Sequence, residues 1–98
     1  WEQTVLVGEI VHVDRFGNLI SNLTQQHLEK ARSVAMGRQL LIRVGKQMIE
    51  GLANSYSEGL AEKPSALMNS NGRLEVFLKE ASAADFLQAR RGGRIEVS

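Results

Sequence analysis

Short apolar runs separated by glycine-containing turns dominate this sequence. The turn signals are Gly17-Asn18, Gly45-Lys46, Asn71-Gly72 and Gly92-Gly93. Glycine, and to a lesser degree asparagine, adopts the left-handed backbone of a tight turn at little cost. The segments between the turns have the length and alternation of strands. We therefore expect a mainly β fold, a small antiparallel, Greek-key-like β-barrel of about six or seven strands with two short helices.

The apolar pattern also places the individual elements. Gly8 is expected at a bulge or a close contact in the first strand, and Gly37 at the end of the first helix. Residues 53–63 are predicted to form a polar, solvated loop. Strands are predicted over residues 5–13, 19–22, 38–44, 47–52, 65–69, 73–78 and 94–97, with helices capped by Thr24 and Ser82.

Length and composition exclude several classes of protein. The 98 residues are expected to form one domain, residues 1–98, with a modest core. A formal net charge of +1 argues against nucleic acid as a partner. No apolar run is long enough to span a bilayer and no signal peptide is recognisable, so we expect no membrane partner. The chain has no cysteine, which favours a cytoplasmic location. Because it begins at Trp1, we expect a fragment or a processed product.

The sequence offers no recognisable catalytic machinery. His12 and His27 lie in different predicted elements and have no carboxylates at a ligand spacing, so no metal site is predicted. The glycines are scattered, and no glycine-rich loop leads into a helix to hold phosphate. No serine has an obvious base beside it. We therefore predict no catalytic residue and no cofactor in this chain.

The segment from Val13 to Asn22 is the most unusual of the turns. It brings an acid, an aromatic ring and amides together at Asp14, Phe16 and Asn18, while the strands on either side fix their directions. The carboxylate of Asp14 can accept hydrogen bonds from an ammonium group, and the amide of Asn18 can donate to and accept from an adenine edge. The alternative is an ordinary hairpin that happens to carry polar side chains.

Other residues could complete a binding site for a polar zwitterion joined to a purine. The ring of Phe16 or Tyr56 can stack on a purine face, although both rings could instead belong to the core or its rim. Ser70 and Asn71 can hold a carboxylate from a tight turn, although Asn71 could act only as a turn former. Glu75 could instead pair with a neighbouring cation, Arg73 or Lys79, on an exposed face.

Two separated motifs resemble those of one known family. The segment Asp14-Arg-Phe-Gly-Asn-Leu-Ile-Ser-Asn22 is similar to the opening motif of the C-terminal domain of the S-adenosylmethionine hydroxide adenosyltransferases, the family that includes the fluorinase and chlorinase. A second similarity lies in Asn69–Glu75, followed by Ser82-Ala83-Ala84. The motifs occur in the family's order and at about its spacing, and the resemblance runs from about Val7 to the end.

The resemblance implies a role for each matching position. Asp14 falls where the family's acid meets the methionine amine, and Asn18 where its asparagine contacts adenine. Phe16 and Tyr56 fall at aromatic positions of the nucleoside pocket. The methionine end would be gripped at Ser70 and Asn71, and Glu75 of the same motif is counted among the substrate-binding residues. The two polar corners, namely the turn at Asp14 and the turn at Ser70-Asn71, are expected to lie at the same rim of the barrel and to bind one molecule together.

The departures from the family pattern bear on the nucleophile. Asn71 stands where the halogenases have arginine, and the spacing from Asp14 to Phe16 is one residue shorter than theirs and lacks their proline. Both features resemble the hydroxide-using branch. The segment Lys79-Glu80-Ala81 replaces the commoner Asn-x-Gly ahead of Ser-Ala-Ala, so purine contacts from that loop are not carried over.

The resemblance therefore implies the C-terminal, substrate-binding domain of an S-adenosylmethionine hydrolase that forms adenosine and methionine. S-adenosylmethionine would be the substrate, and no cofactor is implied. The expected partners are the protein's own larger N-terminal domain and a neighbouring subunit, in a homotrimer whose pockets lie between them. The alternatives are a non-catalytic barrel that binds a nucleoside or peptide, a barrel kept for assembly, and a domain of a halogenase.

Overall fold

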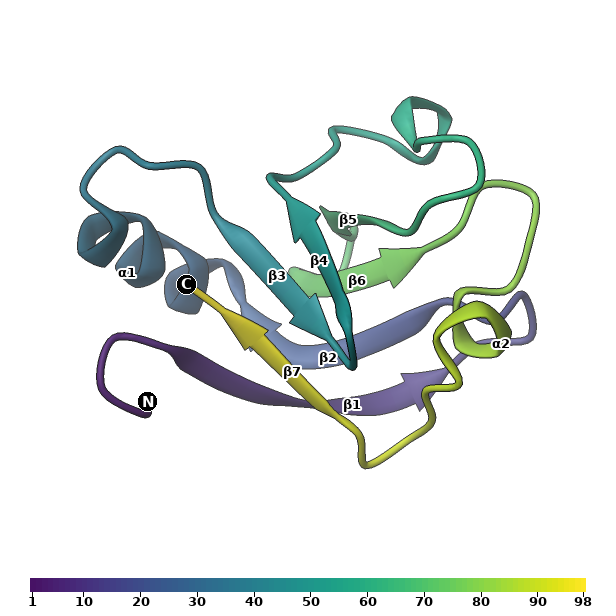
Figure 1. Cartoon of the computed structure of the whole chain (residues 1–98), viewed down its shortest axis with the longest axis horizontal. Coiled ribbons are helices and arrows are strands. Elements are labelled where there is room, and N and C mark those ends of the chain that lie inside the picture. The colour runs from purple at the N-terminus through teal and green to yellow at the C-terminus, as the bar shows by residue number, and fades with distance from the viewer.

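The computed structural model describes all 98 residues, Trp1–Ser98, as seven strands, two α-helices and one 3₁₀ turn (Figure 1). The short segments between the turns form the strands, as the alternation predicts. The strands are β1 (Leu6–Val13), β2 (Leu19–Thr24), β3 (Leu41–Val44), β4 (Gln47–Glu50), β5 (Ser65–Met68), β6 (Arg73–Phe77) and β7 (Arg94–Val97); the helices are α1 (Gln25–Ala35) and α2 (Ala83–Leu87), and the 3₁₀ turn is η1 (Tyr56–Glu58).

The strands form one antiparallel sheet that curls into a nearly closed barrel. Their order is β4-β3-β7-β1-β2-β6-β5, so the C-terminal strand lies in the interior of the sheet between β3 and β1. The two edge strands, β4 and β5, face each other across the seam of the barrel. A backbone hydrogen bond of 2.8 Å from Ala53 N to Ala66 O joins the two sides just beyond β4. The predicted fold class is confirmed.

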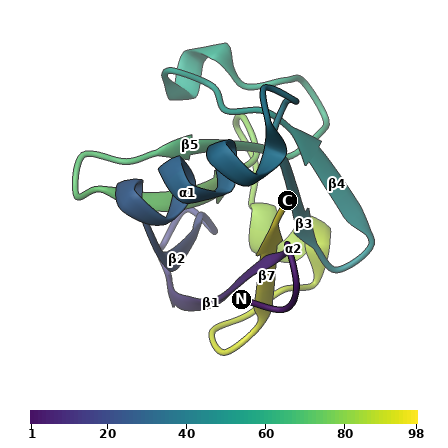
Figure 2. The same ribbon diagram turned by 90° about the vertical axis from the view of Figure 1, so that its left-hand side faces the viewer.

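The two helices lie at opposite ends of the barrel (Figure 1), and Figure 2 shows α1 lying across one of those ends. α1 buries Leu28, Ala31 and Ala35 against the strands. The side chains of Thr24 and Ser82 accept hydrogen bonds from the first turns of α1 and α2, so both predicted caps are confirmed. Each end of the barrel is thus partly covered by a short helix.

Alternation along the strands fills the barrel with branched apolar side chains. The core cluster contains 18 buried residues. The large side chains with no exposed surface include Ile10, Leu19, Ile42, Leu74 and Ile95. Because alternate residues of a strand point to opposite faces, β6 directs Leu74 and Val76 inward and its remaining side chains outward.

Three local expectations need correction or refinement. The close contact at Gly8 is confirmed, because a Cβ there would lie 2.6 Å from the Leu23 side chain. The bulge is elsewhere in β1, where the β1–β2 register shifts between Ile10 and His12.

The left-handed C-cap of α1 is Met36, with φ of 54°, and Gly37 only follows it. The predicted loop contains the turn η1. No helix has the length and apolar character needed to cross a membrane.

Candidate functional site

The turn between β1 and β2 is held by its own aspartate. Oδ1 of Asp14 accepts hydrogen bonds of 2.9 Å from the backbone N–H groups of Phe16 and Asn18. Gly17 has φ of +83°, and its N–H donates to the carbonyl of Asp14 at 2.9 Å. The aspartate therefore shapes the turn with one oxygen. No protein group bonds to its other oxygen, Oδ2.

The turn between β5 and β6 has the same geometry with an asparagine in place of the aspartate. Oδ1 of Asn69 accepts from the N–H groups of Asn71 and Arg73, at 2.9 and 3.0 Å. Gly72 takes the left-handed position, with φ of +76°. Asn71-Gly72 lies in a hairpin turn, as predicted. Of the two residues, the glycine alone has a positive φ.

These two corners do not meet at one rim, and that expectation is wrong. In the antiparallel ladder of β2 and β6, Leu19 pairs with Val76 and Thr24 pairs with Arg73. The Asp14 turn precedes Leu19, whereas the turn carrying Ser70 and Asn71 precedes Arg73. Antiparallel register therefore places the two corners at opposite ends of this ladder, which spans roughly 10 Å along β6 and about 17 Å along the bulged β2. Ser70 and Asn71 are exposed at the α1 end of the barrel.

A cavity of about 610 Å³ lies at the Asp14 end of the ladder, and it brings together three predicted site residues, Phe16, Asn18 and Tyr56. Phe16 is 65% exposed, and Asn18 bonds to the rest of the protein through its backbone alone. Apolar walls and an amide without a partner are features that suit a planar ligand with polar edges. The complete lining is Phe16, Asn18, Tyr56, Ser57, Phe77, Leu78, Lys79, Glu80, Ala81 and Ser82.

Tyr56 is fixed at the cavity by two different contacts. Its ring meets the ring of Phe77 edge-on, with centroids 5.0 Å apart and an interplanar angle of 71°. Its hydroxyl donates to Oε2 of Glu75 at 2.6 Å. The pKa of Tyr56 is raised to about 12, chiefly by partial burial and next by this hydrogen bond. The negative charges of Glu75 and Asp14 add to this rise of the pKa. Asp14 itself is not among the residues that line the cavity.

Glu75 does not lie where a ligand could touch it. The strand alternation directs it to the outer face of β6, as predicted, but the loop carrying η1 covers that face and leaves Glu75 only 3% exposed. Its Oε1 accepts from Nδ2 of Asn69 at 3.0 Å. The alternative ion pair with Arg73 or Lys79 is wrong, because the salt bridges of the chain all involve Arg94.

Sequence reasoning missed the contribution of the loop between β6 and α2. Lys79, Glu80 and Ala81 line the cavity although they depart from the family pattern. Ser82 approaches so closely that a Cβ on Gly17 would lie 1.9 Å from its Oγ. The sequence holds one signal of this approach: Gly17 of the first motif and Ser82 of the second motif occur together in this family pattern, and a glycine is needed where another segment comes this close.

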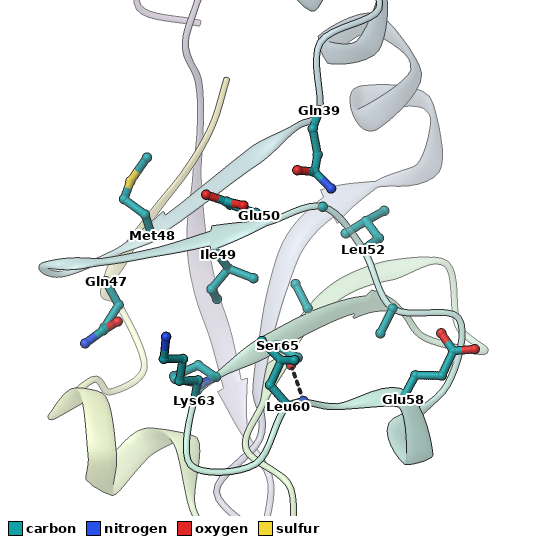
Figure 3. A pocket seen from close by; sticks show the side chains of 14 residues that line it. Gln39, Gln47, Met48, Ile49, Glu50, Leu52, Glu58, Leu60, Lys63 and Ser65 are labelled. Atoms are coloured by element: carbon teal, nitrogen blue, oxygen red, sulfur yellow. Dashed lines mark hydrogen bonds between the residues drawn. The ribbon is translucent and has the colours of Figure 1, made fainter.

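A second cavity, of about 530 Å³, follows the seam between β4 and β5 (Figure 3). Its rim carries polar and charged side chains, among them Glu50, Glu58 and Lys63, around a floor that includes Ile49. None of the predicted site residues lines it. Groups of three or more metal-ligating side chains do not occur in the structure. The cavity with Phe16, Asn18 and Tyr56 is therefore the candidate site.

Comparison with known proteins gives a family and a fold. The family model of the SAM hydroxide adenosyltransferase C-terminal domain matches residues 8–96. An uncharacterized conserved protein from Thermotoga maritima matches 99% of the chain with a TM-score of 0.76 and 22% identity. A conserved hypothetical protein from Thermus thermophilus matches 94% with a TM-score of 0.73 and 25% identity. The chain spans 37% and 34% of these two proteins. No curated protein matches it.

Proposed function

The chain belongs to the family of SAM hydroxide adenosyltransferase C-terminal domains, and we propose that it is the substrate-binding domain of an S-adenosylmethionine hydrolase. The cavity that unites Phe16, Asn18 and Tyr56 is the observation that carries this proposal. Two rings and an amide without a protein partner suit an adenine ring, which needs stacking on its faces and a donor and acceptor at its edge.

The proposed reaction is a displacement at C5′ of the ribose. An oxygen of water or hydroxide forms a bond to C5′ while the bond from C5′ to sulfur breaks. The bonding electrons go to sulfur, which leaves as the neutral thioether of methionine, and water as nucleophile releases one proton. Because the sulfonium charge disappears in this step, desolvation and alignment of the nucleophile accelerate it.

This domain is proposed to hold the substrate rather than to activate water. Adenine would lie against Phe16 and Tyr56 with its edge at Asn18, and the free Oδ2 of Asp14 would accept from the ammonium group. The water-activating residues would belong to a larger N-terminal domain. The complete pocket would form between that domain and this barrel from a neighbouring subunit of a homotrimer.

The position of Ser70 and Asn71 limits their proposed role. The register of β2 and β6 puts them at the other end of the ladder from Asp14. They would reach the carboxylate of a bound molecule only if that molecule extended along the outer side of the ladder. They have no part in binding the nucleoside alone, and this makes Ser70→Ala a control for variants of the cavity.

Titration of the 98-residue chain with adenosine, followed by amide NMR, tests the proposal. We expect weak binding with shift changes at Asn18, Tyr56 and Ser82. Phe16→Ala should weaken binding by about tenfold, since stacking on an aromatic ring contributes roughly 1–3 kcal/mol. Ser70→Ala should leave the affinity for adenosine unchanged. Shift changes confined to residues outside the cavity would contradict the proposed site.

Incubation with S-adenosylmethionine tests the division of labour between domains. The isolated chain should release no adenosine, whereas the protein that contains both domains should release adenosine and methionine in equal amounts. Turnover by the isolated chain would refute the split site. Binding without consumption by the two-domain protein would favour a non-catalytic barrel.

A further inference from the structure

A carboxylate without a cation lies beneath the candidate site. Glu75 is 3% exposed, and neither of the chain's salt bridges includes it. Burying a charged group is costly unless hydrogen bonds replace the lost water. Both of its oxygens are engaged, Oε2 by the hydroxyl of Tyr56 at 2.6 Å and Oε1 by Nδ2 of Asn69 at 3.0 Å. Hydrogen bonds to an ionised acceptor are stronger than neutral ones and offset part of the cost.

On the Tyr56 side, the ring itself has fewer contacts than the loop that carries it. Tyr56 lies in the loop between β4 and β5 and the residue is 48% exposed. Apart from the bond to Glu75, its ring has the edge-on contact with Phe77. The loop itself is tied by hydrogen bonds from Asn54 N to Glu58 Oε1, from Leu60 N to Ser65 Oγ and from Lys79 Nζ to Ser57 O. Edge-on aromatic pairs occur over a range of centroid separations, about 4.5–7 Å, so this contact alone does not fix the ring. The bond to Glu75 fixes the far end of the ring.

The Asn69 side is rigid. Oδ1 of Asn69 accepts from two backbone N–H groups of the β5–β6 turn, those of Asn71 and Arg73. The amide can satisfy these donors only with its NH₂ group directed toward Glu75. The carboxylate is therefore held from the hydrogen-bonded β5–β6 turn and itself holds the tyrosine.

We propose that Glu75 is a positioning residue of the purine cavity, which fixes the Tyr56 ring as a wall before the ligand arrives. This inference rests on the proposed function, because it takes a purine nucleoside as the ligand. A preset wall spares the ligand the cost of ordering the ring. Glu75 thus acts on the ligand only through Tyr56.

A double-mutant cycle with Tyr56→Phe and Glu75→Gln tests the inference on the 98-residue chain. The first variant keeps the ring and removes the hydroxyl, and the second keeps the size of the side chain and removes its charge. Each should weaken adenosine binding by about five- to tenfold, the loss expected when one ordering contact is removed. The double variant should bind adenosine with about the same affinity as the single variant that binds less tightly, because both substitutions remove the same contact. Additive losses, or unchanged affinity in Tyr56→Phe, would overturn the inference.

The orientation of the ring gives a readout that needs no ligand. Tyr56 is the only tyrosine of the chain, so ring-labelled tyrosine gives one set of NMR signals. Glu75→Gln should weaken the cross-relaxation between the rings of Tyr56 and Phe77, whereas Ser70→Ala should not. Unchanged cross-relaxation would overturn the inference. If the native chain binds no adenosine, the proposed function fails while the ring measurement still decides the role of Glu75.

Discussion

Gly17 and Gly72 occupy the same position in two turns of the same geometry, yet we expect their substitution to have different costs. Both have positive φ, +83° and +76°, so alanine is strained at either by about 1 kcal/mol. A Cβ on Gly17 would also lie 1.9 Å from Oγ and 2.8 Å from Cα of Ser82, whereas nothing lies within 4 Å of one on Gly72. Gly17→Ala should lower the free energy of unfolding by about 2–4 kcal/mol and Gly72→Ala by about 1 kcal/mol. Urea denaturation measures both, and equal losses would contradict the close approach of Ser82.

Tyr56 should make the stability depend on pH in the alkaline range. Its pKa rises from 10.0 to about 12 in the folded chain. The folded state keeps the phenol proton where the unfolded state has lost it, so this contribution to stability is complete below pH 10 and is lost as the pH rises to 12. Other effects of high pH act on both proteins alike, so the test is the difference between the native chain and Tyr56→Phe. The native chain should lose more stability than the variant between these pH values, and parallel losses would contradict the shift.

Single residues were predictable from the sequence where the backbone dictates their place. A glycine after Asp14 and Phe16 fixes the turn, and the turn fixes the side chains around it. Of the three side chains expected together, Phe16 and Asn18 line the cavity and Asp14 does not. The burial of Glu75 was not predictable. Alternation shows only that it lies on the outer face of β6, whereas the tyrosine that covers it is 19 residues away in a loop without periodicity.

The N-terminus of α1 should depend on a reciprocal pair of side chains. Oγ1 of Thr24 accepts from the N–H of His27, and Nδ1 of His27 accepts from the N–H of Thr24 at 2.9 Å. Thr24→Ala should lower the free energy of unfolding by about 1 kcal/mol. His27→Ala should cost less, and His27→Gln should largely preserve stability because glutamine supplies the same kind of acceptor. Thermal unfolding of the three variants checks this order, and a larger loss in His27→Gln than in His27→Ala would contradict it.

The elements themselves were well predicted, whereas their relative placement was not. Caps at Thr24 and Ser82 and glycines in the turns are local signals, and they fixed the starts of both helices and the hairpins. Register between β2 and β6 depends on contacts between segments some 50 residues apart, and no local signal specifies it. The expectation of one shared rim failed for this reason, because the similarity of two turns says nothing about which end of a ladder each occupies.

The topology of the whole barrel follows from strands that are distant in the chain. β7 lies between β1 and β3, pairing Leu6 with Val97 and Ile42 with the same residue from the other side. Turn signals predict which neighbouring strands form hairpins, namely β1 with β2, β3 with β4 and β5 with β6. They cannot predict that the last strand completes the centre of the sheet, which depends on the fit of the whole core.

The central place of β7 leads to a prediction about the whole molecule. Deletion of residues 94–98 removes Ile95 and Val97, both without exposed surface, and leaves β1 and β3 without their common neighbour. Burial of each large side chain contributes about 1.5–3 kcal/mol, and a domain of this size has only about 5–15 kcal/mol of stability. The truncated chain should therefore be unfolded in far-UV circular dichroism and in amide NMR.

Deletion of residues 1–4 is the matched control, because it shortens the chain by a similar length and keeps all seven strands. It removes the exposed ion pair of Glu2 with Arg94, which lies at the surface and contributes roughly 0–1 kcal/mol. This variant should remain folded and lose little stability in urea. A folded chain without β7 would mean that β5, β6, β2 and β1 form an independent unit. In that case the candidate site, whose lining comes from the β1–β2 turn, the loop carrying η1, the end of β6 and the loop after it, would not require β7.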